Sequence, residues 1–300
     1  MRVLITGATG LIGGKLTKLC HLKGWSVNYL TTSKSKISNT NNYKGFYWNP
    51  QNNEIDTTCF QDVEAIFHLV GANVAKRWTA EYKEEIIKSR TKTTELLFNE
   101  IKKGNYPVKK VISASAIGIY PSSLTNYYDE NNASINPNFL SEVVSKWEKA
   151  VDALSTLDIL VAKLRIGLVL SNTAGALQKM SQPIKYGFGA AFGRGDQWQS
   201  WIHIDDLVSM FVYVVENDIS GVVNAVAPNP VTNEELTKSI AKKMKRPLIS
   251  PNIPKVVLQL ILGEMHEILF DSQRVSSKKI ESLGFEFNYN NLQPALEDLL

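Results

Sequence analysis

The chain has 300 residues, of which 44% are hydrophobic and 21% are charged, and its formal net charge at pH 7 is +4. A chain of this length and apolar content can bury a large core, so the composition excludes both a disordered protein and a small scaffold held together by disulfides. The charge is mild and the basic pairs lie far apart in the sequence, which argues against nucleic-acid binding.

Apolar strand-like segments alternate with amphipathic helical segments in the first half of the chain. The strand-like segments are rich in Val, Ile and Leu and lack polar alternation, as expected for strands that are buried on both faces. We expect strands at residues 3–6, 27–31, 45–48, 65–70, 108–113 and 157–164, and helices at residues 11–22, 80–103 and 140–154. Repeated units of this kind predict an α/β fold with a doubly wound parallel sheet of the Rossmann type.

The pattern changes after residue 169, where a glycine-rich segment precedes two closely spaced tryptophans. Residues 205–216 and 222–226 predict one more helix and strand of the sheet, whereas residues 228–300 are mainly helical in pattern and begin with a capping box at Thr232 and Glu235. We therefore expect two interleaved domains. The sheet domain comprises residues 1–171 and 205–227, and a smaller, mainly helical cap comprises residues 172–204 and 228–300.

A glycine-rich turn, Thr6-Gly7-Ala8-Thr9-Gly10-Leu11-Ile12-Gly13, follows the first predicted strand and opens the first predicted helix. Its first glycine permits a tight turn, the second lets the backbone approach a pyrophosphate, and the third allows helix and strand to pack closely. The helix N-terminus adds free N–H donors and the positive end of its dipole. This context predicts dinucleotide binding, with contacts from Gly7, Thr9, Gly10, Leu11, Ile12 and Gly13.

The end of the second predicted strand bears on the choice of dinucleotide. An Asp or Glu at this point would accept hydrogen bonds from the ribose 2′-OH of NAD, but no acidic residue occurs from Met1 to Asn53. Thr32 and Ser33 offer hydroxyl donors to a 2′-phosphate, and Lys34 offers a counter-charge. We therefore expect NADP as the cofactor of the sheet domain and consider NAD less favoured; the alternative is that Lys34 is simply a solvated loop lysine.

With this turn, the parallel sheet and Ser113-Ala114-Ser115 at a later strand end, the chain resembles the extended short-chain dehydrogenase/reductases, the NAD(P)-dependent epimerase/dehydratase group. It most resembles the sugar-nucleotide epimerase-like "epimerase family protein" branch, which ends in a small domain of unassigned function. Further motifs that carry the resemblance are Gly71-Ala72-Asn73, Arg77-Trp78-Thr79, Lys88-Ser89-Arg90, Leu164-Arg165-Ile166-Gly167, Ser200-Trp201-Ile202-His203 and Gly284-Phe285-Glu286-Phe287. The resemblance implies additional cofactor contacts from Val70, Gly71, Ala72, Ala114 and Arg165.

Active members of the wider family use a serine near the nicotinamide and a Tyr-x-x-x-Lys pair one helix later. Ser115 matches the serine, but Leu140 and Val144 stand where the tyrosine and lysine should be. The single Tyr-x-x-x-Lys of the sequence, Tyr106 to Lys110, contains a proline and leads into a strand, so it cannot form the helical pair. We take Ser115 and Tyr120 as the candidate catalytic residues; a packed loop aromatic is the alternative for Tyr120.

Candidate substrate contacts follow the fourth strand and the glycine-rich segment, because ligands of doubly wound sheets lie at the carboxyl ends of the strands. An Arg beside a Trp can pair an anion and stack on a ring, and two tryptophans close together suggest a wall over a small ligand. The candidates are Asn73, Arg77, Trp78, Gln197, Trp198, Trp201 and His203. For His203, a structural hydrogen bond near Asp205 or Asp206 is the alternative.

No metal site is expected, because the four histidines are isolated from other ligand types. Cys20 and Cys59 form neither a redox motif nor a disulfide framework, and no apolar run reaches the roughly 20 residues that span a bilayer. We therefore expect a cytoplasmic protein with no membrane or nucleic-acid partner, and a homodimer is one of the open oligomeric states. Two functions remain open: an oxidoreductase or epimerase acting on an unidentified small carbonyl or sugar-nucleotide-like substrate, and a non-catalytic NADP-binding sensor or interaction module.

Overall fold

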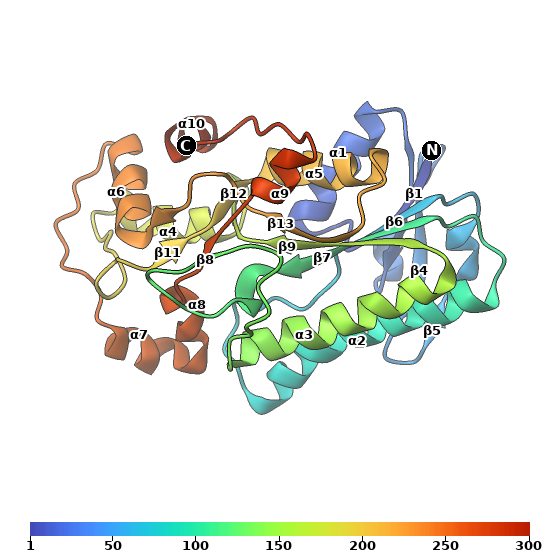
Figure 1. Ribbon diagram of the computed structural model, residues 1–300, viewed down its shortest axis with the longest axis horizontal. Coiled ribbons are helices and arrows are strands. Elements are labelled where there is room, and N and C mark those ends of the chain that lie inside the picture. Colours follow the sequence, from blue (N-terminus) through green and yellow to red (C-terminus); the bar gives the residue numbers. More distant parts are fainter.

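A twisted sheet runs through the middle of the computed structural model, which describes residues 1–300 (Figure 1). Its strands follow the order β13-β9-β7-β6-β1-β2-β4-β3, and β5 pairs with β4. The pairings from β13 to β4 are all parallel, and only the short β3 and β5 run antiparallel to β4. The strands are β1 (Arg2–Thr6), β2 (Ser26–Thr31), β3 (Asn39–Thr40), β4 (Tyr43–Asn49), β5 (Glu54–Ile55), β6 (Ala65–His68), β7 (Lys110–Ala116), β9 (Leu160–Ile166) and β13 (Gly221–Ala225).

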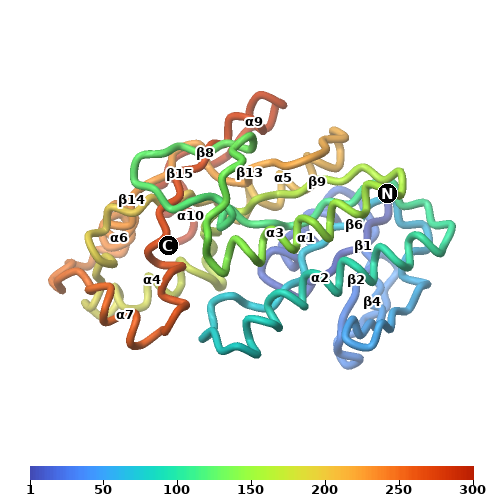
Figure 2. Tube along the Cα trace, turned by 60° about the horizontal axis from the view of Figure 1, so that its bottom comes forward, coloured from blue at the N-terminus to red at the C-terminus, as the bar shows by residue number.

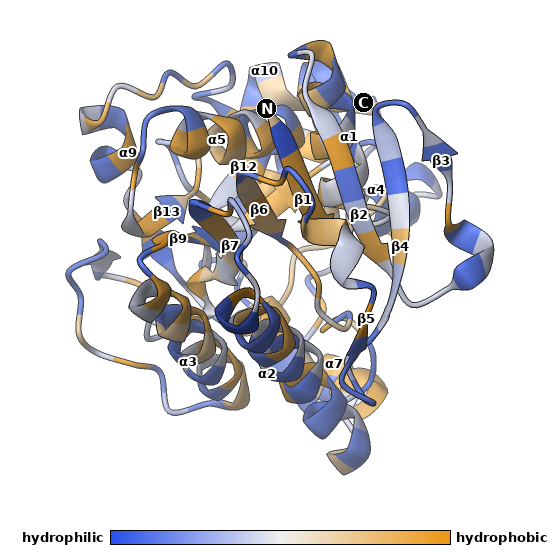
Figure 3. Ribbon diagram, turned by 90° about the vertical axis from the view of Figure 1, so that its right-hand side faces the viewer, coloured by the Kyte–Doolittle hydropathy of each residue, from blue (hydrophilic) through white to orange (hydrophobic).

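Helices cover both faces of this sheet, which confirms the doubly wound α/β prediction. The long helices α2 (Ala80–Lys103) and α3 (Phe139–Asp152) lie side by side on one face. The opposite face carries α1 (Leu11–Leu22) and α5 (Ile204–Glu216), and Figure 3 views the sheet between the two layers. None of the helices combines the length and the apolar character that crossing a membrane requires.

The smaller part of the molecule lies beyond the carboxyl ends of the strands (Figure 2). It holds three two-stranded pairs, which are β10 (Leu168–Leu170) with β12 (Trp201–His203), β11 (Trp198–Gln199) with β14 (Val231–Thr232), and β8 (Tyr127–Tyr128) with β15 (Arg274–Val275). The remaining α-helices are α4 (Ala176–Lys185), α6 (Asn233–Lys243), α7 (Lys255–Leu262), α8 (Glu267–Phe270), α9 (Lys278–Ser282) and α10 (Leu292–Leu299). Short 3-10 turns occur at Lys34–Lys36, Thr57–Phe60, Ile117–Ile119, Ala153–Leu157 and Gly263–His266.

Two main hydrophobic clusters stabilise these parts. The larger has 44 buried residues and lies between the sheet and its helices, and the smaller has 13 buried residues from α4, α6, α10 and the adjoining strands. Ile280 and Phe285 fall within the range expected for the cap, residues 228–300, but pack into the larger cluster. The exact domain boundaries expected from the sequence stay a prediction.

Local sequence signals set several element ends. Thr232 caps α6 by accepting a hydrogen bond from the N–H of Glu235, as the capping box predicts. Gly24 has a φ of +74° just past the end of α1, a conformation that glycine adopts without steric cost. Strand β7 runs three residues beyond its predicted end, because Ala114, Ser115 and Ala116 continue the ladder with β9.

A buried hydrogen-bonded chain joins β1, β6 and α2. The hydroxyl of Thr94 donates to the carbonyl of Arg90 at 2.7 Å, so its oxygen accepts from Nε2–H of His68 at 3.0 Å. Nδ1 of His68 then accepts from the hydroxyl of Thr6 at 2.9 Å. Burial lowers the pKa of His68 from 6.5 to about 4, which keeps the ring neutral in this arrangement.

His68 should make stability depend on pH on the acid side. Because its pKa is lower in the folded state, its contribution is fully present above pH 6.5 and is lost as the pH falls toward 4. We expect the free energy of unfolding of the wild type to fall by about 3 kcal/mol more than that of His68→Gln across this interval. Urea titrations of both proteins at several pH values measure the difference, and parallel curves would contradict it.

Candidate functional site

The carboxyl ends of β1, β2, β6, β7 and β9 meet at one edge of the sheet, toward the smaller part of the molecule (Figure 2). From β1 the chain proceeds to β2 on one side, and β6 lies on the other side. This reversal of strand order opens a crevice in doubly wound sheets, and ligands of such folds bind there. The glycine turn and the loops after β2 and β6 start from this edge.

The glycine turn holds the start of α1 close to the end of β1. A Cβ on Gly13 would lie 2.2 Å from the carbonyl oxygen of Gly7, so only glycine fits there. Gly7 itself has a φ of +73°. Gly10 is the N-cap of α1, yet no side chain caps the helix and no acidic residue stands in its first turn. The first N–H groups of α1 are therefore available to an anionic ligand.

The loop after β2 presents hydroxyl and ammonium groups. The hydroxyls of Ser33 and Ser35 are 2.9 Å apart, and the N–H of Ser33 donates to the hydroxyl of Thr31. Thr32 and Lys34 are exposed, and the ammonium of Lys34 lies 5.0 Å from the ring centroid of Tyr47. The loop thus offers one cation and several hydroxyls without a carboxylate of its own.

The loop after β6 is held by Thr6 of β1 and by two side chains of α2, Ser89 and Arg90. The hydroxyl of Thr6 accepts from the N–H groups of Leu69 and Val70, and the N–H of Ala72 donates to the hydroxyl of Ser89. A Cβ on Gly71 would lie 2.8 Å from the guanidinium carbon of Arg90, which also stacks over Trp147.

Burial lowers the pKa of this Arg90 to about 10, and its Nε has no hydrogen-bond partner. The guanidinium donates instead to the carbonyl oxygens of Ile86 and Ala72. The loop that carries Gly71 therefore packs against the guanidinium of Arg90, which these hydrogen bonds hold in place.

A buried ion pair occupies the region where the catalytic serine was expected. Ser115, Arg165 and Asn224 stand opposite one another on β7, β9 and β13. Arg165 donates to both carboxylate oxygens of Glu148 from α3, each at 2.9 Å. The hydroxyl of Ser115 donates to the same carboxylate at 2.6 Å.

Opposing effects set the pKa of Glu148. Burial alone would raise it, but the hydrogen bonds and charge of Arg165, with the Ser115 hydroxyl, hold the pKa below its usual value. The carboxylate is therefore ionised, both of its oxygens accept hydrogen bonds from Arg165, and the hydroxyl proton of Ser115 is donated to it. The structure gives no support to the expected role of Ser115 in polarising a substrate, nor to Arg165 as a cofactor contact.

Tyr120 extends the same network. Its hydroxyl donates to Oδ1 of Asn224 at 2.8 Å and accepts from Arg165 at 3.0 Å, and the residue is fully buried. Burial raises the pKa of Tyr120, with Arg165 and Asn224 opposing the shift only in part. A proton donor of this family needs the opposite shift and an open path to the ligand. This geometry favours the alternative of a packed loop aromatic.

The two positions of the missing dyad are apolar in the structure as well. Leu140 packs against the cluster formed by Trp78, Ile86 and Val143. Val144 is buried in a different cluster, with Tyr120 among its members. The edge of the sheet near α3 therefore carries no free proton donor at the family's usual places.

The structure separates the seven substrate candidates. Trp78, Gln197, Trp201 and His203 are buried, and each makes a side-chain hydrogen bond within the fold, for instance from the indole N–H of Trp201 to the carbonyl of Asn229. The indole N–H of Trp198 donates to the carbonyl of Leu124, with Arg274 over its ring. Arg77 is exposed, and of the seven only Asn73 lines an apolar cavity between α4, α6 and α7.

His203 holds the end of the chain in place. Its Nδ1 accepts from the N–H of Asp205 and so caps α5, and its Nε2 lies 3.2 Å from the carboxylate of Asp298. Its ring stacks on Tyr289. Burial lowers the pKa of His203, while the three nearby aspartates oppose this shift. The structural hydrogen bond to Asp205 that the sequence left as an alternative is the one observed.

A cavity of about 480 Å³ lies between α4, α6, α7 and the loop after β6. Of its 21 lining residues 13 are hydrophobic, and they include Met180, Ile184, Met265 and Ile268. None of these residues is among the candidates predicted from the sequence. The Val256–Leu262 apolar run was visible, but nothing in the sequence showed that its end and the turn after it face α4.

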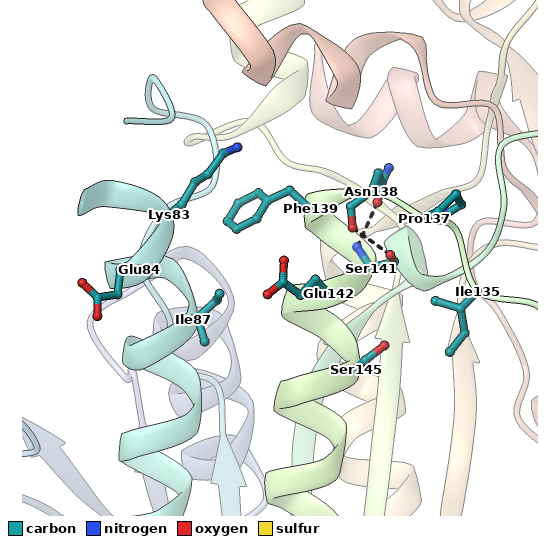
Figure 4. A pocket seen from close by; sticks show the side chains of 10 residues that line it. All are labelled: Lys83, Glu84, Ile87, Ile135, Pro137, Asn138, Phe139, Ser141, Glu142 and Ser145. Atoms are coloured by element: carbon teal, nitrogen blue, oxygen red, sulfur yellow. Dashed lines mark hydrogen bonds between the residues drawn. The ribbon is translucent and has the colours of Figure 1, made fainter. Parts of the chain in front are cut away.

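A second depression is an open groove at the starts of α2 and α3, shown in Figure 4. Lys83, Glu84 and Ile87 come from α2, and Asn138 and Glu142 come from the beginning of α3. Its walls carry charges of both signs, and these helices cover the sheet face opposite to α1. The glycine turn and the apolar cavity are therefore the candidate ligand site.

Comparison with known proteins places this chain in a family. Residues 3–140 match the NAD dependent epimerase/dehydratase family, and residues 253–299 match a domain of unknown function, DUF1731. An epimerase family protein of Staphylococcus aureus is 37% identical over 298 residues, covering 99% of this chain and 98% of its own. An epimerase family protein of Staphylococcus epidermidis is 34% identical over 300 residues, covering 100% and 99%.

Solved structures agree with these matches. The human epimerase family protein SDR39U1 (isoform 2), crystallised with NADPH, superposes with a TM-score of 0.86 at 28% identity, covering 100% of this chain and 99% of that one. UDP-glucuronic acid 4-epimerase from Bacillus cereus, in complex with UDP-glucuronic acid and NAD, has a TM-score of 0.79 at 16% identity, covering 100% and 98%. The latter likeness shows the fold alone.

Removing Glu148 should destabilise the protein strongly. Glu148→Ala leaves Arg165 buried without its counter-charge, so we expect a loss of about 3–5 kcal/mol in the free energy of unfolding. The matched control is Glu142→Ala on the same helix, which removes an exposed pair with Lys146 and should cost less than about 1 kcal/mol. Denaturant titration measures both, and similar losses in the two variants would show that the buried pair is not structural.

Proposed function

Because this chain belongs to the NAD dependent epimerase/dehydratase family, in its branch of epimerase family proteins, we propose that it binds NADP(H) and acts on a small molecule in the adjoining cavity. The observation that carries the proposal is the start of α1, which is uncapped, free of acidic residues and held against β1 by Gly13. Such a helix start neutralises a pyrophosphate through its N–H groups and dipole.

The preference for NADP over NAD is supported by the loop after β2. A 2′-phosphate carries negative charge and strong acceptor oxygens, which suit Lys34 and the hydroxyls of Thr32, Ser33 and Ser35. A carboxylate at this place, which would hold the 2′-OH of NAD, is missing from the first 53 residues. The structure of human SDR39U1 with NADPH agrees with this preference.

When bound, NADPH supplies a hydride to an acceptor. The residues of this chain hold the pyrophosphate, read the 2′-phosphate and shape the acceptor cavity, but Ser115 and Tyr120 are engaged in the Glu148 network. An oxidoreductase built this way takes its proton from solvent or from a group outside the usual dyad.

The second candidate function is a non-catalytic NADP(H)-binding module. The same network favours it, because Ser115 and Tyr120, the two expected catalytic residues, both hydrogen-bond within the fold. Absorbance at 340 nm during incubation with a panel of carbonyl compounds distinguishes the two. Oxidation of NADPH above the rate of the protein-free mixture supports the oxidoreductase, and tight NADPH binding with no oxidation supports the module.

Reversing the charge at the 2′-phosphate position should switch the cofactor preference. In Lys34→Glu we expect the affinity for NADPH to fall at least about tenfold while that for NADH changes less than about threefold. The control is Lys44→Glu, which makes the same charge change at an exposed residue of β4 that pairs with Asn28, away from the carboxyl edge. Fluorescence titration with both cofactors measures this. Equal losses for NADPH in the two variants would refute the assignment of Lys34.

The close packing of the glycine turn provides a second test. Gly13→Ala forces Cβ against the carbonyl of Gly7, so we expect NADPH affinity to fall at least about tenfold together with the melting temperature. In Gly14→Ala the nearest atom would be 3.7 Å away, and the added methyl group should raise helix propensity without affecting NADPH. Unchanged NADPH affinity in Gly13→Ala would mean that the nucleotide binds elsewhere.

A further inference from the structure

We propose that the cavity beside the glycine turn takes an uncharged, largely apolar carbonyl compound and excludes nucleotide sugars. This inference rests on the proposed function for its carbonyl, because a cofactor that carries hydride needs an acceptor. The choice of an apolar over a charged ligand rests on the cavity alone.

The cavity adjoins the start of α1. Gly175, which lines the cavity and is the N-cap of α4, lies so close to Leu11 that a Cβ there would be 3.4 Å from its side chain. Leu11 is the first residue of α1, directly after the glycine turn. Asn73 and Ala75, from the loop after β6, line the same cavity. A ligand inside it therefore lies beside the proposed dinucleotide crevice.

The cavity wall offers almost no charge. Lys179, an exposed residue on α4, is the single charged side chain among the 21 that line it, and no arginine or carboxylate is present. A nucleotide sugar carries two linked phosphates. Moving them from water into an apolar cavity costs several kcal/mol unless fixed cations and N–H donors replace the lost hydration. One solvated lysine does not supply that replacement.

The few polar groups in the wall are largely committed to the fold. Oδ1 of Asn233 accepts from the N–H of Phe192, and the hydroxyl of Thr237 donates to the carbonyl of Asn233. Oδ1 of Asn73 accepts from the N–H of Ala75. What remains are the amide N–H groups of Asn73 and Asn233 and the side-chain amide of Gln199, a set too small for the many hydroxyls of a sugar but sufficient for a single carbonyl oxygen.

The apolar wall continues toward the place of the missing tyrosine. Met265 and Ile268 line the cavity and also pack against the cluster around Trp78, which Leu140 joins from α3. At the mouth, Phe188 lines the cavity while 71% exposed. From mouth to inner wall, a ligand meets hydrophobic side chains, and burying its apolar surface provides the driving force for binding.

A charge placed in the wall tests the proposal. Met180 is half-buried in the wall on α4, where either Leu or Lys keeps the helix. Calorimetric titration of the NADP⁺-saturated protein with 2-acetylnaphthalene, a neutral aryl ketone, and with UDP-glucose gives both affinities. We expect the wild type to bind the ketone at least about tenfold more tightly than UDP-glucose. Met180→Lys should weaken ketone binding at least about tenfold, and Met180→Leu less than about threefold.

NADPH affinity, measured alongside, separates the two proposals. It should be the same in the wild type and both variants, because Met180 does not belong to the glycine turn. A chain that binds no NADPH overturns the proposed function. A chain that binds NADPH but prefers UDP-glucose, or holds the ketone equally well in Met180→Lys, overturns the inference about the cavity and leaves the cofactor assignment standing.

Discussion

The buried pair of Glu148 and Arg165 is the interaction on which the middle of this molecule depends. Burying two charges costs desolvation energy, which their attraction offsets only when the geometry is good and the remaining acceptors are filled. Both conditions are met, because Arg165 is bidentate and the hydroxyl of Ser115 fills a third position. The pair thereby ties β7 and β9 to α3, and Tyr120 links Arg165 to Asn224 on β13.

This arrangement divides the site into two halves with different physical character. The cofactor half depends on backbone geometry, since Gly13 must pack on Gly7 and the start of α1 must stay uncapped. The half that would perform proton transfer is a closed hydrogen-bonded network. The first half needs nothing from the second, so a chain can keep the nucleotide site of its family while the usual acid is absent.

The sequence predicted the features that depend on near neighbours. The glycine turn, the ends of α1 and α2 and the Thr232 cap of α6 are set within a few residues, and all are observed. It could not show that Ser115 donates to Glu148, because the two are 33 positions apart and meet only when α3 docks on β7. The cavity was likewise hidden, since Met180 and Met265 reach it from distant segments whose spacing shows only that each is amphipathic.

The apolar residue at the lysine position, Val144, and the paired carboxylate of Glu148 belong to the same packing between α3 and the sheet. Val144 and Glu148 are one helical turn apart and share a face of α3, so a lysine at position 144 would point into the cluster of Tyr120, Val226 and Val275. There it would find Glu148 already neutralised by Arg165, and its own charge would be buried without a partner. Restoring the family's lysine would therefore require this core to be repacked and the carboxylate to change partners. The absence of the usual dyad is thus part of the packing between α3 and the sheet. Leu140, at the tyrosine position, packs in the same cluster as Met265 and Ile268, which line the cavity.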